Sequence, residues 1–231
     1  MIKRIGRYLK GKPRVVWQYK WQGLEEELEV FTDSNWAGCR NTGKSTSGGA
    51  MRIGEHLIKA WSRTQQCVTM SSAEAELVAM VKASAEALGL LSMAKDLGNE
   101  VMRKAAILGD SSAALAVAGR KGCGKLRHIN VGLLWIQEKQ QNEQLDYRKV
   151  AGAVNCADLM TKHVNQLVME EHCQRMGQRF REGRAKEAFK AQTHLQASKE
   201  EYKASEVLLW RWDGGWLKVI VKLHVIMIAY R

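Results

Sequence analysis

The chain has 231 residues, of which 45% are hydrophobic and 26% are charged, as in a globular protein with enough apolar material for a sizeable core. Its net charge of +12 and isoelectric point near 9.6 favour polyanionic partners, and nucleic acid is the commonest of these. The five cysteines are scattered and form no C-x-x-C pair, which argues against a zinc knuckle and a disulfide framework and predicts reduced thiols.

The amino-terminal segment, residues 1–24, carries seven lysines and arginines before its first acidic residue. We expect a basic helix or linker that ends near Pro13, followed by a short strand. The segment has no apolar run long enough for a signal peptide. The apolar stretch at residues 217–230 is 14 residues long and contains Lys218 and Lys222, whereas a bilayer span needs about 20 apolar residues. The sequence therefore predicts no transmembrane segment, no membrane partner and an intracellular protein, cytoplasmic or nuclear.

Three strand-like runs follow, at residues 24–38, 46–57 and 58–68. In the first run, Leu28, Val30 and Thr32 occur at every second position, which is the period of a strand. A turn at Gly54-Glu55-His56 divides the other two runs. The pattern predicts a three-stranded meander.

From residue 71 the hydrophobic period becomes that of a helix. Within residues 71–98, one helical face collects Leu77, Met80, Val81, Ser84, Leu88 and Leu91. The next elements are expected in the order strand, helix, helix, strand and start of a last helix, at residues 104–110, 111–118, 128–144, 145–152 and 155–164. This order predicts a mixed α/β fold.

The pattern weakens after residue 164. Helically spaced apolar residues predict a helix with a charged continuation over residues 165–203, and they are Met169, Cys173, Met176 and Phe180. Residues 204–231 form a Trp-rich apolar tail, interpreted either as a docking hairpin or as read-through sequence without function. We therefore divide the chain into a basic segment at 1–24, a main domain at 25–164 and these two carboxyl-terminal segments.

The stretch from Gly38 to Ser45 matches the phosphate-loop pattern G-x-x-x-x-G-K-[ST]. A working phosphate loop must open a helix, whose N-terminus holds the phosphates. Here Ser45 is followed by "TSGGAMRIG", and two glycines in an alternating run do not predict a helix. We expect a hairpin connection after the strand that carries Asp33, and we keep a nucleotide-hydrolysing enzyme as the least favoured alternative.

Two acidic stretches raise the question of a metal site. Asp33 lies in an apolar strand-like run, where a buried carboxylate costs several kcal/mol without a partner or a metal ion, although a turn would also suit it. Ser71 and Glu74 match a capping box, which gives Glu74 a structural role at the helix start. Glu76 has no such role and, at about 100° per residue, points away from Glu74. We expect Glu76 to be the one that faces a metal ion.

Two further carboxylates lie at element ends. Asp110 ends the strand at 104–110, where sites in α/β sheets collect, and it would also serve as the N-cap of the next helix. Asp158 follows Asn155 by three residues, so Asn155 would cap a helix with Asp158 favourably placed on its dipole. Each carboxylate alone fits a structural role at least as well as a functional one, and the case for a site rests on all four.

Five blocks of the sequence occur in order at the spacing of one family: "FTDSNWAGCRNTGKSTSGG", "SSAEAELVAM", "GDSSAALA", "KLRHIN" and "NCADLMTK". Over about residues 3–164, the chain resembles the ribonuclease H domain of copia-type retrotransposon Pol polyproteins. The opening "RIGRYLKGK" resembles the segment that joins reverse transcriptase to that domain. The departures are mild, with Leu77 where an aromatic residue is common and Ser111 where asparagine is common. The loop before Asp158 also lacks the histidine that many ribonucleases H carry.

The resemblance implies an α/β ribonuclease H-like fold, in which a five-stranded mixed sheet combines a three-stranded antiparallel meander with parallel strands and is flanked by helices. It implies that the catalytic and metal-binding carboxylates are Asp33, Glu76, Asp110 and Asp158. Two Mg²⁺ ions about 3.5–4 Å apart, for which Mn²⁺ can substitute, would promote hydrolysis of the RNA strand of an RNA–DNA hybrid.

Basic residues near the carboxylates in chain order are expected to contact the nucleic-acid backbone, and they are Arg40, Lys44, Lys121, Lys125, Arg127 and His128. Each also fits a solvated surface position, and His128 fits a loop or helix start. A reverse transcriptase domain, in the same chain or a separate one, is a further expected partner. The alternative to an active nuclease is a catalytically inactive remnant or nucleic-acid-binding module with the same fold.

Overall fold

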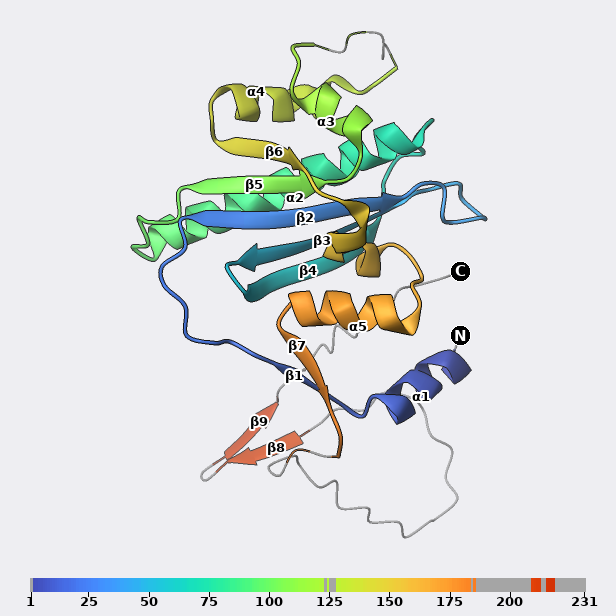
Figure 1. Ribbon diagram of the computed structural model, residues 1–231, viewed down its shortest axis with the longest axis vertical. Helices are drawn as coiled ribbons and strands as arrows, with labels where there is room; N and C mark the ends of the chain where they lie inside the picture. Colours follow the sequence, from blue (N-terminus) through green and yellow to red (C-terminus); the bar gives the residue numbers. More distant parts are fainter. Residues whose placement is uncertain are drawn as a thin grey trace. The chain divides into compact units, whose positions relative to one another are not determined.

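The computed structural model describes residues 2–122, 124, 128–183, 185, 209–212 and 215–218 (Figure 1). Two compact units make up the chain, one formed by Met1–Gly183 with Ile228–Arg231 and the other by Arg184–Met227. The first unit contains the large sheet and all four carboxylates, so the site is built within it.

The predicted antiparallel meander consists of β2 (Glu27–Asn35), β3 (Thr46–Ile53) and β4 (His56–Thr64). The turn between β3 and β4 falls at Gly54, as expected, and Gly54 adopts a φ of +56°, which glycine tolerates at no steric cost.

The connection between β2 and β3 decides the phosphate-loop question. Residues 36–45, all of which the structure describes, contain turns and no helix, and Thr46 begins a strand. The hairpin interpretation is confirmed. The phosphate-loop interpretation is wrong, because no helix N-terminus follows Ser45 to hold a phosphate group.

Two parallel strands complete the sheet, β5 (Lys104–Gly109) and β6 (Leu145–Lys149). β5 runs parallel to β2 and β6 runs parallel to β5, which gives the strand order β4-β3-β2-β5-β6. The flanking helices are α2 (Ser72–Asp96), α3 (Ser112–Ala118) and α4 (Trp135–Gln141) (Figure 1). The predicted arrangement, a five-stranded mixed sheet that combines an antiparallel meander with parallel strands and is flanked by helices, is confirmed.

The central strand β2 is covered on both faces. Leu28 and Val30 belong to a core cluster with Leu77 of α2, whereas Phe31 belongs to a second cluster that includes Met160. In Figure 1, α2 runs behind β2 and β5, and the gold turns after β6 lie in front of the sheet. A strand buried on both faces loses its polar alternation, which explains the unbroken burial of β2 from Val30 to Ser34.

Helix α2 is long and apolar enough to cross a membrane, judged by length and composition alone. Its residues Leu77, Met80 and Ala83 are nonetheless buried in the core cluster against the sheet. This burial against the sheet is typical of a core helix.

The stretch at residues 155–164 departs from the prediction. It forms a single 3-10 turn, η3 (Cys156–Met160), rather than the start of a last helix. Asn155 caps this turn by accepting from the Ala157 N–H, and its side-chain amide also donates to the Thr32 carbonyl of β2 at 3.0 Å. This tie to the sheet fixes the turn, and the chain then begins a separate helix, α5 (Gln166–Arg175). Two further 3-10 turns are η1 (Val131–Leu134), which opens the helix expected at 128–144, and η2 (Gly152–Val154).

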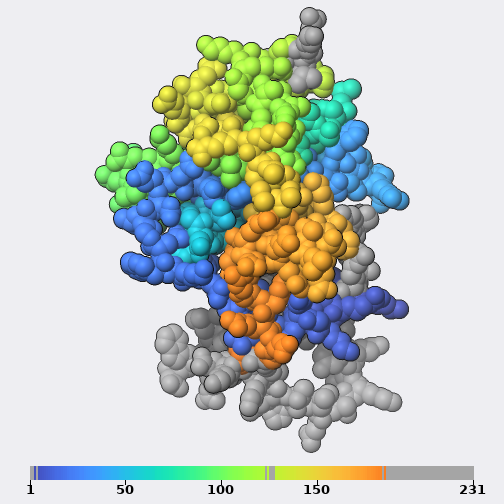
Figure 2. All heavy atoms as spheres, viewed as in Figure 1, coloured from blue at the N-terminus to red at the C-terminus, as the bar shows by residue number. Residues whose placement is uncertain are grey.

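The two ends of the first unit pair with each other. As predicted, the basic segment forms a helix, α1 (Ile2–Gly11), followed by a short strand, β1 (Arg14–Trp17). β1 pairs antiparallel with β7 (Gln178–Arg181), and Lys12 forms an ion pair with Glu170 of α5. In the space-filling view, the orange atoms of α5 and β7 lie against the gold turns that follow β6 (Figure 2).

Strand β7 was not predicted, and the expected helical spacing through Phe180 is wrong. The helix ends at Arg175 because Gly177 adopts a φ of +72° just beyond it, a common way for a helix to terminate.

In the second unit, β8 (Leu209–Trp212) pairs antiparallel with β9 (Gly215–Lys218). The Trp-rich tail therefore contains a hairpin, and its docking role stays a prediction. The rest of that tail, including residues 219–230 of the apolar stretch considered for a membrane span, lies outside the described residues.

Candidate active site

Three carboxylates from three different elements meet at one edge of the sheet. Asp33 is on β2, and Asp110 directly follows the parallel neighbour β5, so the two lie at the same ends of adjacent strands. Glu76 comes from the first turns of α2. One oxygen from each of Asp33, Glu76 and Asp110 lies within 4.8 Å of the other two. The structure thus brings together three of the four residues named from the sequence.

The two glutamates at the start of α2 have different surroundings. Ser71 caps the helix by accepting from the Glu74 N–H at 3.2 Å, and the Glu74 carboxylate accepts from the Met70 N–H at 2.7 Å. The Glu76 carboxylate instead accepts from the Ser34 N–H of β2 at 3.2 Å. Glu74 therefore has the capping role expected of it, and Glu76 faces the other carboxylates.

Asp110 has no capping role at α3. The residue that caps this helix is Ser111, whose hydroxyl accepts from the Ala114 N–H at 3.3 Å. The backbone of Gly152 lies close to Asp110, because a β-carbon at Gly152 would stand 3.4 Å from Asp110 Oδ2. Asp110 is therefore not the N-cap of α3, and its carboxylate is available to the three-carboxylate group.

Asp158 stands apart from the three-carboxylate group. It lies on η3, and its Oδ1 accepts from Lys162 Nζ at 3.2 Å. The same ammonium donates to Asp33 Oδ1 at 2.9 Å, so Lys162 bridges the two aspartates. Thr161 donates from its hydroxyl to the other oxygen of Asp33. Asp158 is connected to the cluster through Lys162 and Asp33.

Sequence reasoning missed Lys162 and Thr161 as members of the site. Both lie in the "NCADLMTK" block, but neither was assigned a role. One signal was available, since Asp158 and Lys162 are four residues apart, which is the spacing of a favourable ion pair on a helical turn. The contact with Asp33 could not be read from the sequence, because 129 residues separate the two.

The electrostatics of the cluster are those of crowded, buried negative charge. Burial raises the pKa of Glu76 to about 8, and the charges of Asp33 and Asp110 add to the shift. Burial also raises the pKa of Asp33, although hydrogen bonds from Thr161 and Lys162 act in the opposite direction. Carboxylates in this state gain most from a cation held between them. Their oxygens are the ligands that Mg²⁺ prefers, so the residues present fit a divalent ion.

Those of the basic residues named from the sequence that the structure describes lie in loops. Arg40 and Lys44 lie in the β2–β3 connection, and Lys121 is exposed after α3. His128 lies 3.6 Å from Glu74 Oε2, beside the helix cap. Lys125 and Arg127 lie outside the described residues.

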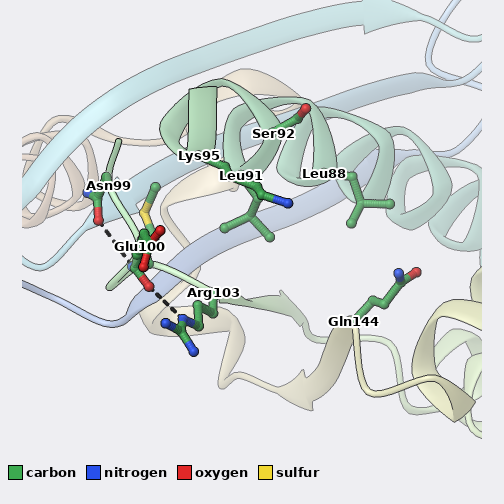
Figure 3. Close-up of a pocket in the computed structure, with 9 residues that line it drawn as sticks. Leu88, Leu91, Ser92, Lys95, Asn99, Glu100, Arg103 and Gln144 are labelled. Carbon is green, nitrogen blue, oxygen red and sulfur yellow. Dashed lines mark hydrogen bonds between the residues drawn. The ribbon is translucent and has the colours of Figure 1, made fainter. Parts of the chain in front are cut away.

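A cavity of about 580 Å³ lies at the carboxyl-terminal end of α2, away from Glu76 at the start of that helix (Figure 3). Leu88 and Leu91 of α2 line it together with Arg103, whose side chain donates to the Glu100 carbonyl at 2.6 Å. Figure 3 shows no second carboxylate beside Glu100 among the labelled residues, so this cavity does not compete with the carboxylate cluster as the site of metal chemistry.

Comparison with proteins of known sequence finds retrotransposon polyproteins. The chain is 28% identical over 177 residues to the retrovirus-related Pol polyprotein from transposon RE1 of Arabidopsis thaliana, a match that covers 76% of this chain and 12% of the relative. It is 29% identical over 164 residues to that from transposon TNT 1-94 of Nicotiana tabacum, covering 71% of this chain and 12% of the relative. The chain is homologous to a segment of copia-type retrotransposon Pol polyproteins. It spans about an eighth of the length of these Pol relatives.

No protein-family model matches the chain. Among solved structures, it is similar to ribonuclease H1 from Halobacterium salinarum, with 18% identity, 58% of this chain and 94% of that chain covered, and a TM-score of 0.39. It is also similar to LC11-RNase H1 in complex with an RNA/DNA hybrid, with 18% identity, 58% and 93% covered, and a TM-score of 0.41.

Proposed function

We propose that this Pol-related chain is a ribonuclease H that hydrolyses the RNA strand of RNA–DNA hybrids during retrotransposon reverse transcription. The observation that carries the proposal is the meeting of Asp33, Glu76 and Asp110, one oxygen of each within 4.8 Å of the others, at one sheet edge. Three carboxylates from β2, α2 and the end of β5 have no mutual stabilisation without cations. Homology to Pol polyproteins supports a nuclease of this type.

Asp33, Glu76 and Asp110 would hold one divalent ion. Asp158 and Asp33 together would hold a second divalent ion. Mg²⁺ is the natural ion for an all-oxygen site, and Mn²⁺ can substitute. When bound, the ions supply Lewis-acid chemistry that activates water and stabilises the charge on the leaving 3′-oxygen. The role of this chain's own residues is to orient the ligands: the Ser34 N–H holds Glu76, and Thr161 holds Asp33.

The substrate assignment rests on charge and on homology. A net charge of +12 favours a polyanion as partner. Contacts to its phosphates would come from exposed basic side chains such as those of Arg40 and Lys121. Lys44 in the β2–β3 connection is a further contact in this proposal, as are Lys125, Arg127 and His128. Selection for RNA would come from its 2′-hydroxyls and from the shape of the hybrid duplex. A reverse transcriptase domain would deliver that hybrid.

The test is cleavage of a labelled RNA–DNA hybrid by the purified chain in Mg²⁺. Asp110→Asn removes one ligand charge and should lower the rate by about 100-fold or more, since several kcal/mol of charge stabilisation depends on the ligands. The matched control is Asp146→Asn, which changes an exposed aspartate paired with Arg148 on β6 and should leave the rate unchanged.

Three results are distinguishable. Cleavage of the RNA strand by the wild type and by Asp146→Asn, but not by Asp110→Asn, supports the proposal. Hybrid binding with steep salt dependence and no cleavage by any variant would mean an inactive nucleic-acid-binding module instead. Equal cleavage by all three would mean that Asp110 does not belong to the site.

A further inference from the structure

Lys162 places a positive charge where the second metal ion of the proposed site would lie. Its Nζ is 2.9 Å from Asp33 Oδ1 and 3.2 Å from Asp158 Oδ1. The Asp33 side chain is 1% exposed, and its two oxygens accept from Lys162 and Thr161. A buried carboxylate without a partner would cost several kcal/mol, so the ammonium is the counter-ion that lets Asp33 stay buried in the metal-free protein.

The same contacts exclude a divalent ion shared by the two aspartates. Mg²⁺ binds carboxylate oxygens at about 2.0–2.1 Å, closer than the ammonium approaches them, so the ion and Nζ would need the same space. Their charges would also repel each other. Of the lysines that the structure describes, only Lys162 contacts the three-carboxylate group of Asp33, Glu76 and Asp110, at Asp33 Oδ1, and the group stays open to an ion.

The place of Lys162 in the chain and its exposure allow its side chain to move away from the two aspartates. Lys162 lies two residues after the end of η3, and its backbone N–H donates to the Asp158 carbonyl at 2.9 Å, so the lysine and Asp158 share one turn. Its side chain is 41% exposed, unlike that of Asp33, and four rotatable bonds allow the ammonium to swing outward to solvent.

We propose that Lys162 is an internal counter-ion that occupies the metal position between Asp33 and Asp158, and that a second divalent ion binds there only after Lys162 is displaced. The inference rests on the proposed function, because it needs the metal site. It predicts that the two divalent ions bind with unequal affinity. One binds to the open carboxylate group, and the other binds weakly because it competes with the ammonium of Lys162.

The test is Mn²⁺ binding measured by calorimetry without nucleic acid, so that the readout does not depend on activity. Lys162→Met removes the charge and keeps the apolar stem, and it should tighten the second Mn²⁺ by about 10-fold or more. The matched control is Lys59→Met. Lys59 is a lysine of similar exposure on β4 that pairs with Glu86 of α2, and its replacement should leave both Mn²⁺ affinities unchanged. In EDTA, Lys162→Met should unfold at a lower temperature than the wild type, and Mn²⁺ should restore more of its stability than it restores to Lys59→Met.

A second variant keeps the inference testable if Lys162→Met fails to fold in EDTA. Lys162→Arg retains the charge and the pairing with both aspartates, so it should bind the second Mn²⁺ no more tightly than the wild type. Equal affinity for the second ion in wild type, Lys162→Met and Lys162→Arg, together with hybrid cleavage, would overturn the role of Lys162 and leave the proposed function standing. No Mn²⁺ binding and no cleavage by any variant would overturn both.

Discussion

At the scale of single residues, the site concentrates carboxylates whose charge the protein balances only in part, through Lys162. Glu76 faces Asp33 and Asp110, and burial raises its pKa to about 8 from an ordinary value of 4.5. The folded protein therefore holds a proton on Glu76 over a pH range in which the unfolded chain has released it. Between about pH 4.5 and pH 8 the native state binds more protons, so stability must fall as the pH rises through this window.

This linkage gives a prediction for the metal-free protein. Chemical unfolding in EDTA at several pH values should show the free energy of unfolding decreasing from pH 5 to pH 8. Glu76→Gln should flatten that decrease, and the part that remains should come from Asp33, whose pKa is also raised by burial. Glu74→Gln is the control two residues away, and because it weakens the cap at Met70 it should cost about 1 kcal/mol. A slope that survives unchanged in Glu76→Gln would contradict the assignment of the shift to this residue.

At the scale of elements, η3 reaches the sheet only because β3 has a glycine beneath it. A β-carbon at Gly48 would stand 2.6 Å from Thr161 Cγ2, 2.7 Å from Met160 Cβ and 3.1 Å from the Ala157 carbonyl oxygen. Two of these three atoms are on or next to the backbone and cannot rotate away. Because η3 carries Asp158 and leads into Lys162, the missing side chain at Gly48 sets the distance between these residues and Asp33.

Gly48→Ala should therefore push η3 off the sheet and lower the free energy of unfolding by about 1–3 kcal/mol, as overpacking does. It should also weaken metal binding, because Asp158 moves away from Asp33. Gly89→Ala is the matched control, since Gly89 lies inside α2 with nothing within 4 Å of its added β-carbon. Alanine there should stabilise the protein by about 0.5–1 kcal/mol through helix propensity. Thermal unfolding and Mn²⁺ titration of both variants measure the two effects, and two variants of equal stability would refute the close packing.

The elements that could be predicted from the sequence are those with a strong local period. Alternation in β2 and helical spacing in α2 follow from which residues face the core. Capping chemistry, which is visible in the sequence, also distinguishes Glu74 from Glu76. The turn η3 and strand β7 were not predictable in this way. η3 depends on Asn155 reaching Thr32 across the fold, and β7 exists because β1, far away in the chain, offers it a pairing edge.

At the scale of the whole molecule, the site also combines features that follow from local sequence patterns with features that depend on long-range contacts. The position of Asp110 at a strand end favours a site, and the family resemblance implies its grouping with Asp33. The bridge from Lys162 to Asp33 depends on how η3 packs across 129 residues of sequence, which no local pattern encodes. The first unit also closes on itself, because β1 near its start pairs with β7, and Lys12 forms an ion pair with Glu170 of α5.

This closure predicts how the chain tolerates truncation. A chain that ends at Gly183 keeps α5, β7 and the whole first unit up to that residue, so it should bind Mn²⁺ and cleave hybrid as the full chain does. A chain that ends at Val164 loses Met176, which is 2% exposed and packs in the cluster of Phe31, and it leaves β1 without its partner strand. Burying a methionine is worth about 1.5–3 kcal/mol, so its thermal midpoint should fall by more than about 5 °C. Differential scanning calorimetry of the three chains decides the point, and an unchanged midpoint in the shorter chain would show that α5 and β7 do not support the sheet.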